Sequence, residues 1–250
     1  MSNIVILSDT TPKPAYLPRI LVDHYTGTYS ADSAATNHPA NAARSPLTYS
    51  TWKPDAYPGT LTLDIGTLES VDYAGIYFLG ESTTIKLEWF DGTAWNEFDE
   101  RTVVDKQSIV WLFYEDASRV RVTISAGSIA TFQCGREIVW PIGIQPSFAP
   151  ANLNPESEYT NTVSQGGQVL GRSEMRQSRS ERFSIDNIEP EWVYGNWPTV
   201  RDRIRKNGAW FVWNPKEYPN DVHYGMTERN PSAEWTSPLY MRTQIDLIGP

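Results

Sequence analysis

Alternating apolar and polar residues over 60–65 constrain the fold more than any other feature of this sequence. Leu61, Leu63 and Ile65 fall on one side of an extended strand, and polar residues fall on the other. This pattern indicates a half-buried antiparallel strand, with one face on a core and the other in solvent. The alternation returns over 85–89 and 119–124, and a tight turn is expected at Asp91-Gly92. The sequence therefore predicts a mainly β chain that contains a β-sandwich.

Four prolines between Val139 and Ser157 interrupt the strand pattern, since proline cannot continue a central strand. A chain of 250 residues is long enough for one large β domain or two modest ones, and this stretch favours two. We expect an N-terminal arm over 1–15, a sandwich over 16–136, a proline-rich connection over 137–158 and a second β-rich domain over 159–250.

One helix is expected in the second domain. Val193, Trp197, Val200 and Ile204 recur at helical spacing. Asn196 can cap a helix ahead of Pro198, and Asn207-Gly208 can end it. We therefore expect a helix near 197–206.

Charge and cysteine content exclude some classes of protein. The formal net charge of -9 argues against a nucleic-acid-binding surface, which is usually basic. Cys134 is the only cysteine, so no disulfide can form within the chain. The N-terminus lacks a basic leader, and its apolar run is too short for a signal peptide or a membrane span. We expect no membrane insertion.

No catalytic or metal-binding constellation is evident in the sequence. The three histidines, His24, His38 and His223, lack metal-ligand spacing. Gly166-Gly167 is not followed by the lysine and hydroxyl residue of a nucleotide-binding loop. We therefore expect a protein that is not an enzyme and that uses no cofactor or metal.

The first half of the chain resembles the discoidin, or galactose-binding-like, jelly roll. The resemblance rests on Thr51-Trp52, the strand that ends in Asp64-Ile65-Gly66, and the later runs 88–95 and 120–124. It implies a sandwich whose long loop, 31–58, covers one end. Stacked aromatic residues at such an end are typical of sugar sites, although the family normally keeps a Trp at the position of Trp52 as an internal plug. The candidate carbohydrate-binding residues are Arg44, Trp52, Asp55, Tyr57 and Trp95.

The second half is similar to structural proteins in the tails of long-tailed bacteriophages. The residues that carry this likeness are 166–172, the predicted helix, and the run 208–215 with Tyr218-Pro219. The likeness implies assembly with copies of itself and with other phage tail proteins, in a virion put together in the host cytoplasm. The predicted place is the tail tip, distal tail or baseplate region.

An assembly surface can be predicted from three segments. The short apolar strand Ile4, Val5, Ile6 and Leu7 is separated from the body by prolines, so it could pair with a neighbour's sheet edge. The planar guanidinium groups of an arginine run could form bidentate ion pairs with carboxylates of a neighbouring subunit. The simpler interpretation is that these arginines lie on a solvent-exposed strand face. The candidate interface residues are Ile4 to Leu7, Arg172, Arg176, Arg179, Arg182, Trp210 and Trp213.

Two functions therefore remain open from the sequence. The first is a structural component of a phage tail, present in several copies. The alternative is a carbohydrate-binding module that recognises cell-surface glycans.

Overall fold

The computed structural model describes residues 3–8, 12–144, 148–150, 153 and 156–250, without the side chains of 156–159 and 174–178. The mainly β fold class is confirmed. The first part contains β1 (Ile4–Leu7), β2 (Arg19–His24), β3 (Thr28–Ala31), the 3-10 helix η1 (Ala40–Arg44), β4 (Gly59–Leu79), β5 (Thr83–Phe90), β6 (Trp95–Val103), β7 (Gln107–Ile124) and β8 (Ser128–Val139). The second contains β9 (Glu156–Val163), β10 (Val169–Ile188), α1 (Pro190–Asn207), β11 (Ala209–Val212), β12 (Val222–Thr227), β13 (Ser232–Trp235) and β14 (Met241–Gly249).

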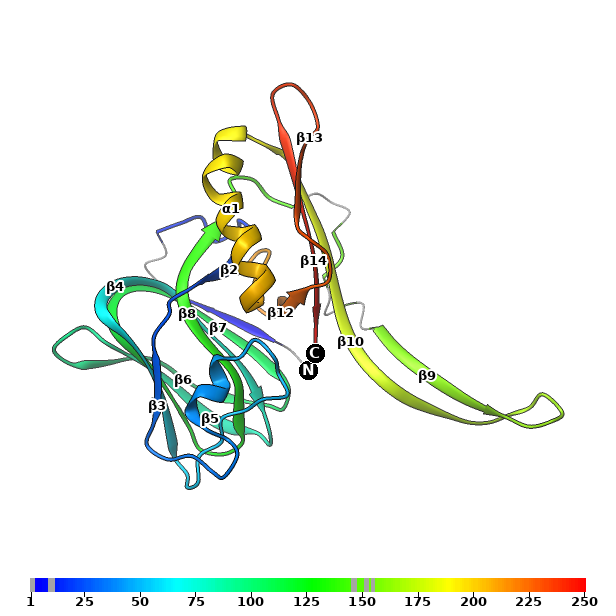
Figure 1. Ribbon diagram of the computed structural model, residues 1–250, viewed down its shortest axis with the longest axis horizontal. Helices are drawn as coiled ribbons and strands as arrows, with labels where there is room; N and C mark the ends of the chain where they lie inside the picture. The colour runs from blue at the N-terminus through cyan, green and yellow to red at the C-terminus, as the bar shows by residue number, and fades with distance from the viewer. Residues whose placement is uncertain (1–2, 9–11, 145–147, 151–152, 154–155) are drawn as a thin grey trace.

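The sandwich is built on two long strands, β4 and β7, that run together through both layers (Figure 1). Residues 59–64 of β4 pair with 124–119 of β7, and residues 71–78 pair with 115–107. Between these segments the register shifts, and Gly66 adopts a φ of 92°, which favours glycine. The strands therefore double back, and the same pair of strands contributes to both layers.

The predicted alternation is confirmed where β4 enters the sandwich. Leu61 and Leu63 are fully buried, and Ile65 is partly buried against the same core. Trp111 and Phe113 of β7 also belong to this core. The sandwich interior is thus filled by side chains from one face of each layer.

One continuous sheet joins the two predicted domains. Its strand order passes from β4 through β8, β2, β11, β12, β14 and β10 to β9. The linking strand is β2, which pairs with β8 on one edge and β11 on the other. The predicted division at 137–158 remains a prediction, but pairing across β2 connects the two parts directly.

The helix starts earlier than the sequence predicted. α1 spans Pro190–Asn207, with Pro190 in its first turn and Pro198 in its interior. Asn196 does not cap the helix, because its side-chain amide donates to the carbonyl of Trp192 at 3.0 Å. The predicted start of the helix was wrong because proline is favoured in the first turn of a helix, and both Pro190 and Pro198 fit that preference. Val193, Trp197, Val200 and Ile204 form its buried face, as the spacing predicts.

The N-terminal strand β1 pairs within its own chain. Ile4–Leu7 lies parallel to β7, in register from Ile4 with Ile109 to Leu7 with Leu112. Val5 is buried, and its amide donates to the carbonyl of Pro219 at 2.6 Å. The expectation that this strand is left to pair with a neighbouring subunit is therefore corrected, because it already pairs within its own chain. Its role between subunits stays a prediction.

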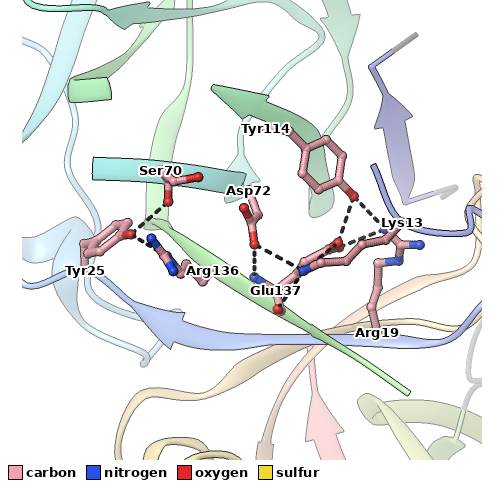
Figure 2. Close-up of polar contacts among 8 residues, drawn as sticks. All are labelled: Lys13, Arg19, Tyr25, Ser70, Asp72, Tyr114, Arg136 and Glu137. Carbon is pink, nitrogen blue, oxygen red and sulfur yellow. Dashed lines mark hydrogen bonds and ion pairs between the residues drawn. The ribbon is translucent and has the colours of Figure 1, made fainter. Parts of the chain in front are cut away.

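A buried charge network ties the segment before β2 to the sandwich (Figure 2). Arg19 and Glu137 are both fully buried and form an ion pair at 2.8 Å. The Tyr114 hydroxyl accepts from Arg19 at 2.8 Å and donates to Glu137 at 3.0 Å. Lys13 lies 3.4 Å from Glu137 and 3.5 Å from Asp72. Because a buried ion is costly without its counter-ion, these groups depend on one another.

We expect Glu137→Gln to lower the free energy of unfolding by about 3–5 kcal/mol, because it leaves the buried Arg19 without its partner charge. Urea denaturation monitored by tryptophan fluorescence measures this change. The control is Asp202→Asn, which breaks the exposed pair with Arg201 and should leave stability nearly unchanged. Equal effects of the two substitutions would contradict a structural role for the network.

Candidate functional site

The loops before and after β4 gather at one end of the sandwich. The Tyr57 hydroxyl donates to the carbonyl of Gly127 at 2.6 Å, and Trp52 pairs with Ile129 through their backbones. The amide of Gly80 donates to Asp105 at 2.8 Å. Loops 32–58, 80–82, 104–106 and 125–127 therefore form one surface, hereafter the loop end.

Trp52 holds the long loop in place from inside. Its side chain is fully buried, and its indole N–H donates to the carbonyl of Ser33 at 3.1 Å. A side chain without exposed surface cannot stack on a sugar, so the predicted carbohydrate contact through Trp52 is corrected. The burial agrees with the internal plug that the resemblance implied.

Tyr57 and Asp55 are the candidate sugar-binding residues that the loop end exposes together. Tyr57 is 40% exposed, and its bond to Gly127 fixes the ring. Partial burial raises the pKa of its hydroxyl. Asp55 is exposed, and its amide donates to the Ser33 hydroxyl at 3.3 Å. The same loop thus presents an anchored aromatic ring and, two residues earlier, an exposed carboxylate.

Trp95 lies at the opposite end of the sandwich. The register aligns Ile85 of β5 with Ile124, near the loop end, and Phe90 with Arg119, near the far bend. Trp95 pairs with Phe90, so it sits at the far end, where Arg121 stacks over its ring at 4.0 Å. The predicted grouping of Trp95 with Tyr57 is therefore corrected.

Arg44 belongs to a different part of the long loop. It is exposed on η1, whose Ala43 packs into the sandwich core. η1 lies against β3 and β8. Its placement with Asp55 and Tyr57 in one sugar site stays a prediction.

A cleft of about 460 Å³ lies between the long loop and the second part of the chain, and it was not predicted. One wall is Pro46–Tyr49 of the long loop, and the other is formed by Tyr224–Glu228 of β12 and the residues after it, with Ile248–Pro250. The Tyr224 hydroxyl donates to the carbonyl of Pro46 at 2.7 Å and links the two walls. Tyr49 is 84% exposed and Leu47 is 39% exposed at its rim. No local sequence signal could reveal a cleft whose walls are far apart in the chain.

Of the two tryptophans predicted at an assembly surface, Trp210 is fully buried in the core between β7 and β12. The predicted contact through Trp210 is therefore corrected. Trp213 is half-buried and stacks on Tyr218 with ring centres 4.5 Å apart. An aromatic run in a strand does not reveal which layers will cover it.

The predicted arginines all belong to β10. Arg172 is exposed, Arg179 is half-buried, and the side chain of Arg176 lies outside the described residues. Arg182 is exposed but pairs at 2.8 Å with Asp246 of β14 in the same chain. Intersubunit pairing through this run stays a prediction.

β9 and the first half of β10 form a two-stranded ribbon that extends away from the body (Figure 1). Its pairing runs from Ser178 with Glu156 to Val169 with Val163, and Gly167 turns the chain with a φ of 81°. Residues 160–163 and 165–173 are all exposed, including Val163, Val169 and Leu170. In the part of the chain that the structure describes, β9 pairs only with β10.

Two of the three histidines are buried and uncharged at neutral pH. Burial lowers the pKa of both His24 and His223 to about 3. His24 contacts the Tyr73 hydroxyl and the carbonyl of Gly208. Among the described residues, no group of three or more His, Cys, Asp or Glu side chains could hold a metal ion. Within the same residues, no helix is both long and apolar enough to span a membrane.

Comparison with solved structures returns carbohydrate-binding modules. A family 32 module from Clostridium perfringens NanJ, in complex with galactose, is 21% identical with a TM-score of 0.40, covering 44% of this chain and 93% of that one. The family 32 module of AlyQ, in complex with 4,5-unsaturated mannuronic acid, is 13% identical with a TM-score of 0.41, covering 45% and 98%. A Ruminococcus gnavus GH29 fucosidase, in complex with fucose, is 12% identical with a TM-score of 0.41, covering 45% and 25%.

The other two comparisons find no relatives. No protein-family model matches the sequence, and no curated protein matches it. Both functions predicted from the sequence therefore stay predictions.

Stability should fall as the pH drops below about 6.5, because the unfolded chain protonates His24 and His223 while the folded chain does not. Each histidine lowers the free energy of unfolding by about 1.4 kcal/mol per pH unit until its folded pKa of about 3 is reached. Urea denaturation between pH 6.5 and 5 avoids most carboxylate titration. His223→Gln should roughly halve the slope measured for the original chain. An unchanged slope in His223→Gln would contradict this account.

Proposed function

We propose that the sandwich is a non-catalytic module that binds a carbohydrate at its loop end. The observation that carries the proposal is the anchored, half-exposed ring of Tyr57, which lies two residues from the exposed Asp55 in the same loop. A fixed ring loses little freedom on binding, and its face suits the apolar face of a sugar. The Asp55 carboxylate can accept hydrogen bonds from sugar hydroxyls. The neighbouring carbohydrate-binding modules share the fold, and the choice of ligand rests on these residues.

Tyr57→Ala should weaken glycan binding at least about fivefold, because it removes the stacking surface. The ligand is first found by screening the full chain on a glycan array, and affinities are then measured by calorimetry. Trp95→Ala is the matched control, since it removes an aromatic ring at the opposite end of the sandwich. The proposal fails if no glycan binds the full chain, or if both variants bind equally well.

We also propose, as a second function, that the chain is a structural component of a multi-copy assembly of the phage-tail type. The ribbon of β9 and β10 favours this function. An isolated two-stranded ribbon is marginally stable in water, so its exposed length needs a partner. Tyr159–Val163 contains no charged residue and no proline, the residues that commonly prevent an exposed edge strand from pairing with another chain. Such an edge suits strand addition by another subunit.

The sequence likeness to phage tail proteins falls partly on this ribbon. Residues 166–172, which contribute to the likeness, form its turn and the start of β10. The ribbon and the loop end occupy different parts of the molecule (Figure 1). A single chain could therefore join an assembly through the ribbon and present a glycan-binding surface through the sandwich.

Replacing residues 160–173 by Asn-Gly should give a folded chain that no longer enters tail particles. Tyr159 and Glu174 are paired, so the short turn closes the ribbon at that register. Incorporation is measured by immunoblot of purified particles assembled with the variant in place of the full chain, and thermal unfolding checks the fold. The control is Leu68→Ser, an exposed apolar residue at the far bend of β4. Normal incorporation of the shortened chain would refute the role of the ribbon.

A further inference from the structure

A second projecting hairpin, formed by β13 and β14, carries a compact apolar tip. Trp235 is 52% exposed, Leu239 is 70% exposed and Tyr240 is 40% exposed, with exposed Pro238 between them. We call these four residues the knuckle. Figure 1 shows this turn beyond the end of α1, away from the sandwich. Apolar side chains gathered at a projecting turn indicate an interaction surface.

The knuckle is held in shape by its own turn. The amides of Thr236 and Ser237 both donate to the carbonyl of Tyr240, at 3.0 Å and 3.3 Å. The Ser237 hydroxyl accepts from the amides of Leu239 and Tyr240, at 3.3 Å and 3.1 Å. A turn fixed in this way loses little conformational freedom on binding.

The cleft described above lies at the other end of the same strand. Trp235 pairs with Met241, the first residue of β14, while Ile248 and Gly249 line the cleft. An extended strand rises by about 3.3 Å per residue, so roughly 25 Å separates the two ends. A chain therefore cannot place its own knuckle in its own cleft.

The two surfaces match in chemistry. The cleft offers Leu47, Tyr49, Met226 and Ile248 as apolar lining, and its volume of about 460 Å³ can receive bulky apolar side chains. Both surfaces leave large apolar side chains in water when the chain is alone. Burial of the knuckle in the cleft would remove these apolar side chains from water, which is favourable.

Charge at the knuckle favours a protein partner over a lipid surface. Arg242, at the base of the hairpin, pairs with Asp186 and lies 3.6 Å from Glu234. An anionic membrane surface attracts clusters of unpaired Lys and Arg, and residues 232–241 contain neither.

We propose that the knuckle of one copy docks into the cleft of a second copy of this chain. The contact is head to tail, because its two sides are different surfaces at opposite ends of β14. Head-to-tail contacts produce rings when the rotation closes and filaments when it does not. This contact adds to the proposed assembly function, but it uses no residue of the ribbon, so the two can fail separately.

Two variants test the contact by analytical ultracentrifugation over a range of concentrations. Trp235→Ser with Leu239→Ser removes the knuckle, and Leu47→Glu with Tyr49→Ser disables the cleft, all at exposed positions. Each should weaken self-association at least about tenfold. The matched control, Tyr16→Ser with Leu68→Ser, changes exposed apolar residues elsewhere and should associate like the original chain.

Mixing the two variants gives the sharpest readout. One partner keeps a cleft and the other keeps a knuckle, so the mixture should form a 1:1 dimer and nothing larger. With Leu239→Cys on the chain that keeps the knuckle and Thr48→Cys on the chain that keeps the cleft, oxidation should link chains only between these two positions, since Cys134 is buried. A monomer at all concentrations, unchanged association of either variant, or a mixture that stays monomeric would overturn the proposal.

Discussion

Strand β2 holds the molecule together because both of its edges are paired. β8 of the sandwich lies on one side, and β11 of the second part lies on the other. Its two faces also serve different cores: Ile20 and Val22 pack with α1, while Leu21 packs with Trp210. Buried Arg19 at its start then requires Glu137 of β8. Loss of β2 would therefore separate the sheet and expose two cores at once.

Local patterns in the sequence predicted what depends on local geometry. The alternation at Leu61 and Leu63 predicted the buried face of β4, and the spacing of Val200 and Ile204 predicted the buried face of α1. The start of the helix was wrong because two prolines satisfy the same rule and only packing distinguishes them. Period and composition thus predicted which residues are buried, but not every boundary.

The site depends on long-range register, which a single sequence does not display. Whether Trp95 lies near Tyr57 depends on which end of the sandwich its hairpin faces, and the pairing of β5 with β7 decides this. The sequence predicted that Trp210 is available for assembly, but residues of β7 and β12 pack against it in a buried core. The cleft needs Pro46 and Tyr224 side by side, and these residues are joined only in the folded chain.

The long loop connects the two proposed activities physically. Its stretch Pro46–Tyr49 forms one wall of the cleft, and Asp55 and Tyr57 follow a few residues later in the same loop. A neighbour's knuckle in the cleft would contact the loop that also presents the sugar-binding ring. If docking changes glycan affinity by some factor, glycan binding must change docking affinity by the same factor. Trp52 lies between these two stretches and anchors the loop in the core, so the size of this coupling depends on how firmly Trp52 holds the loop.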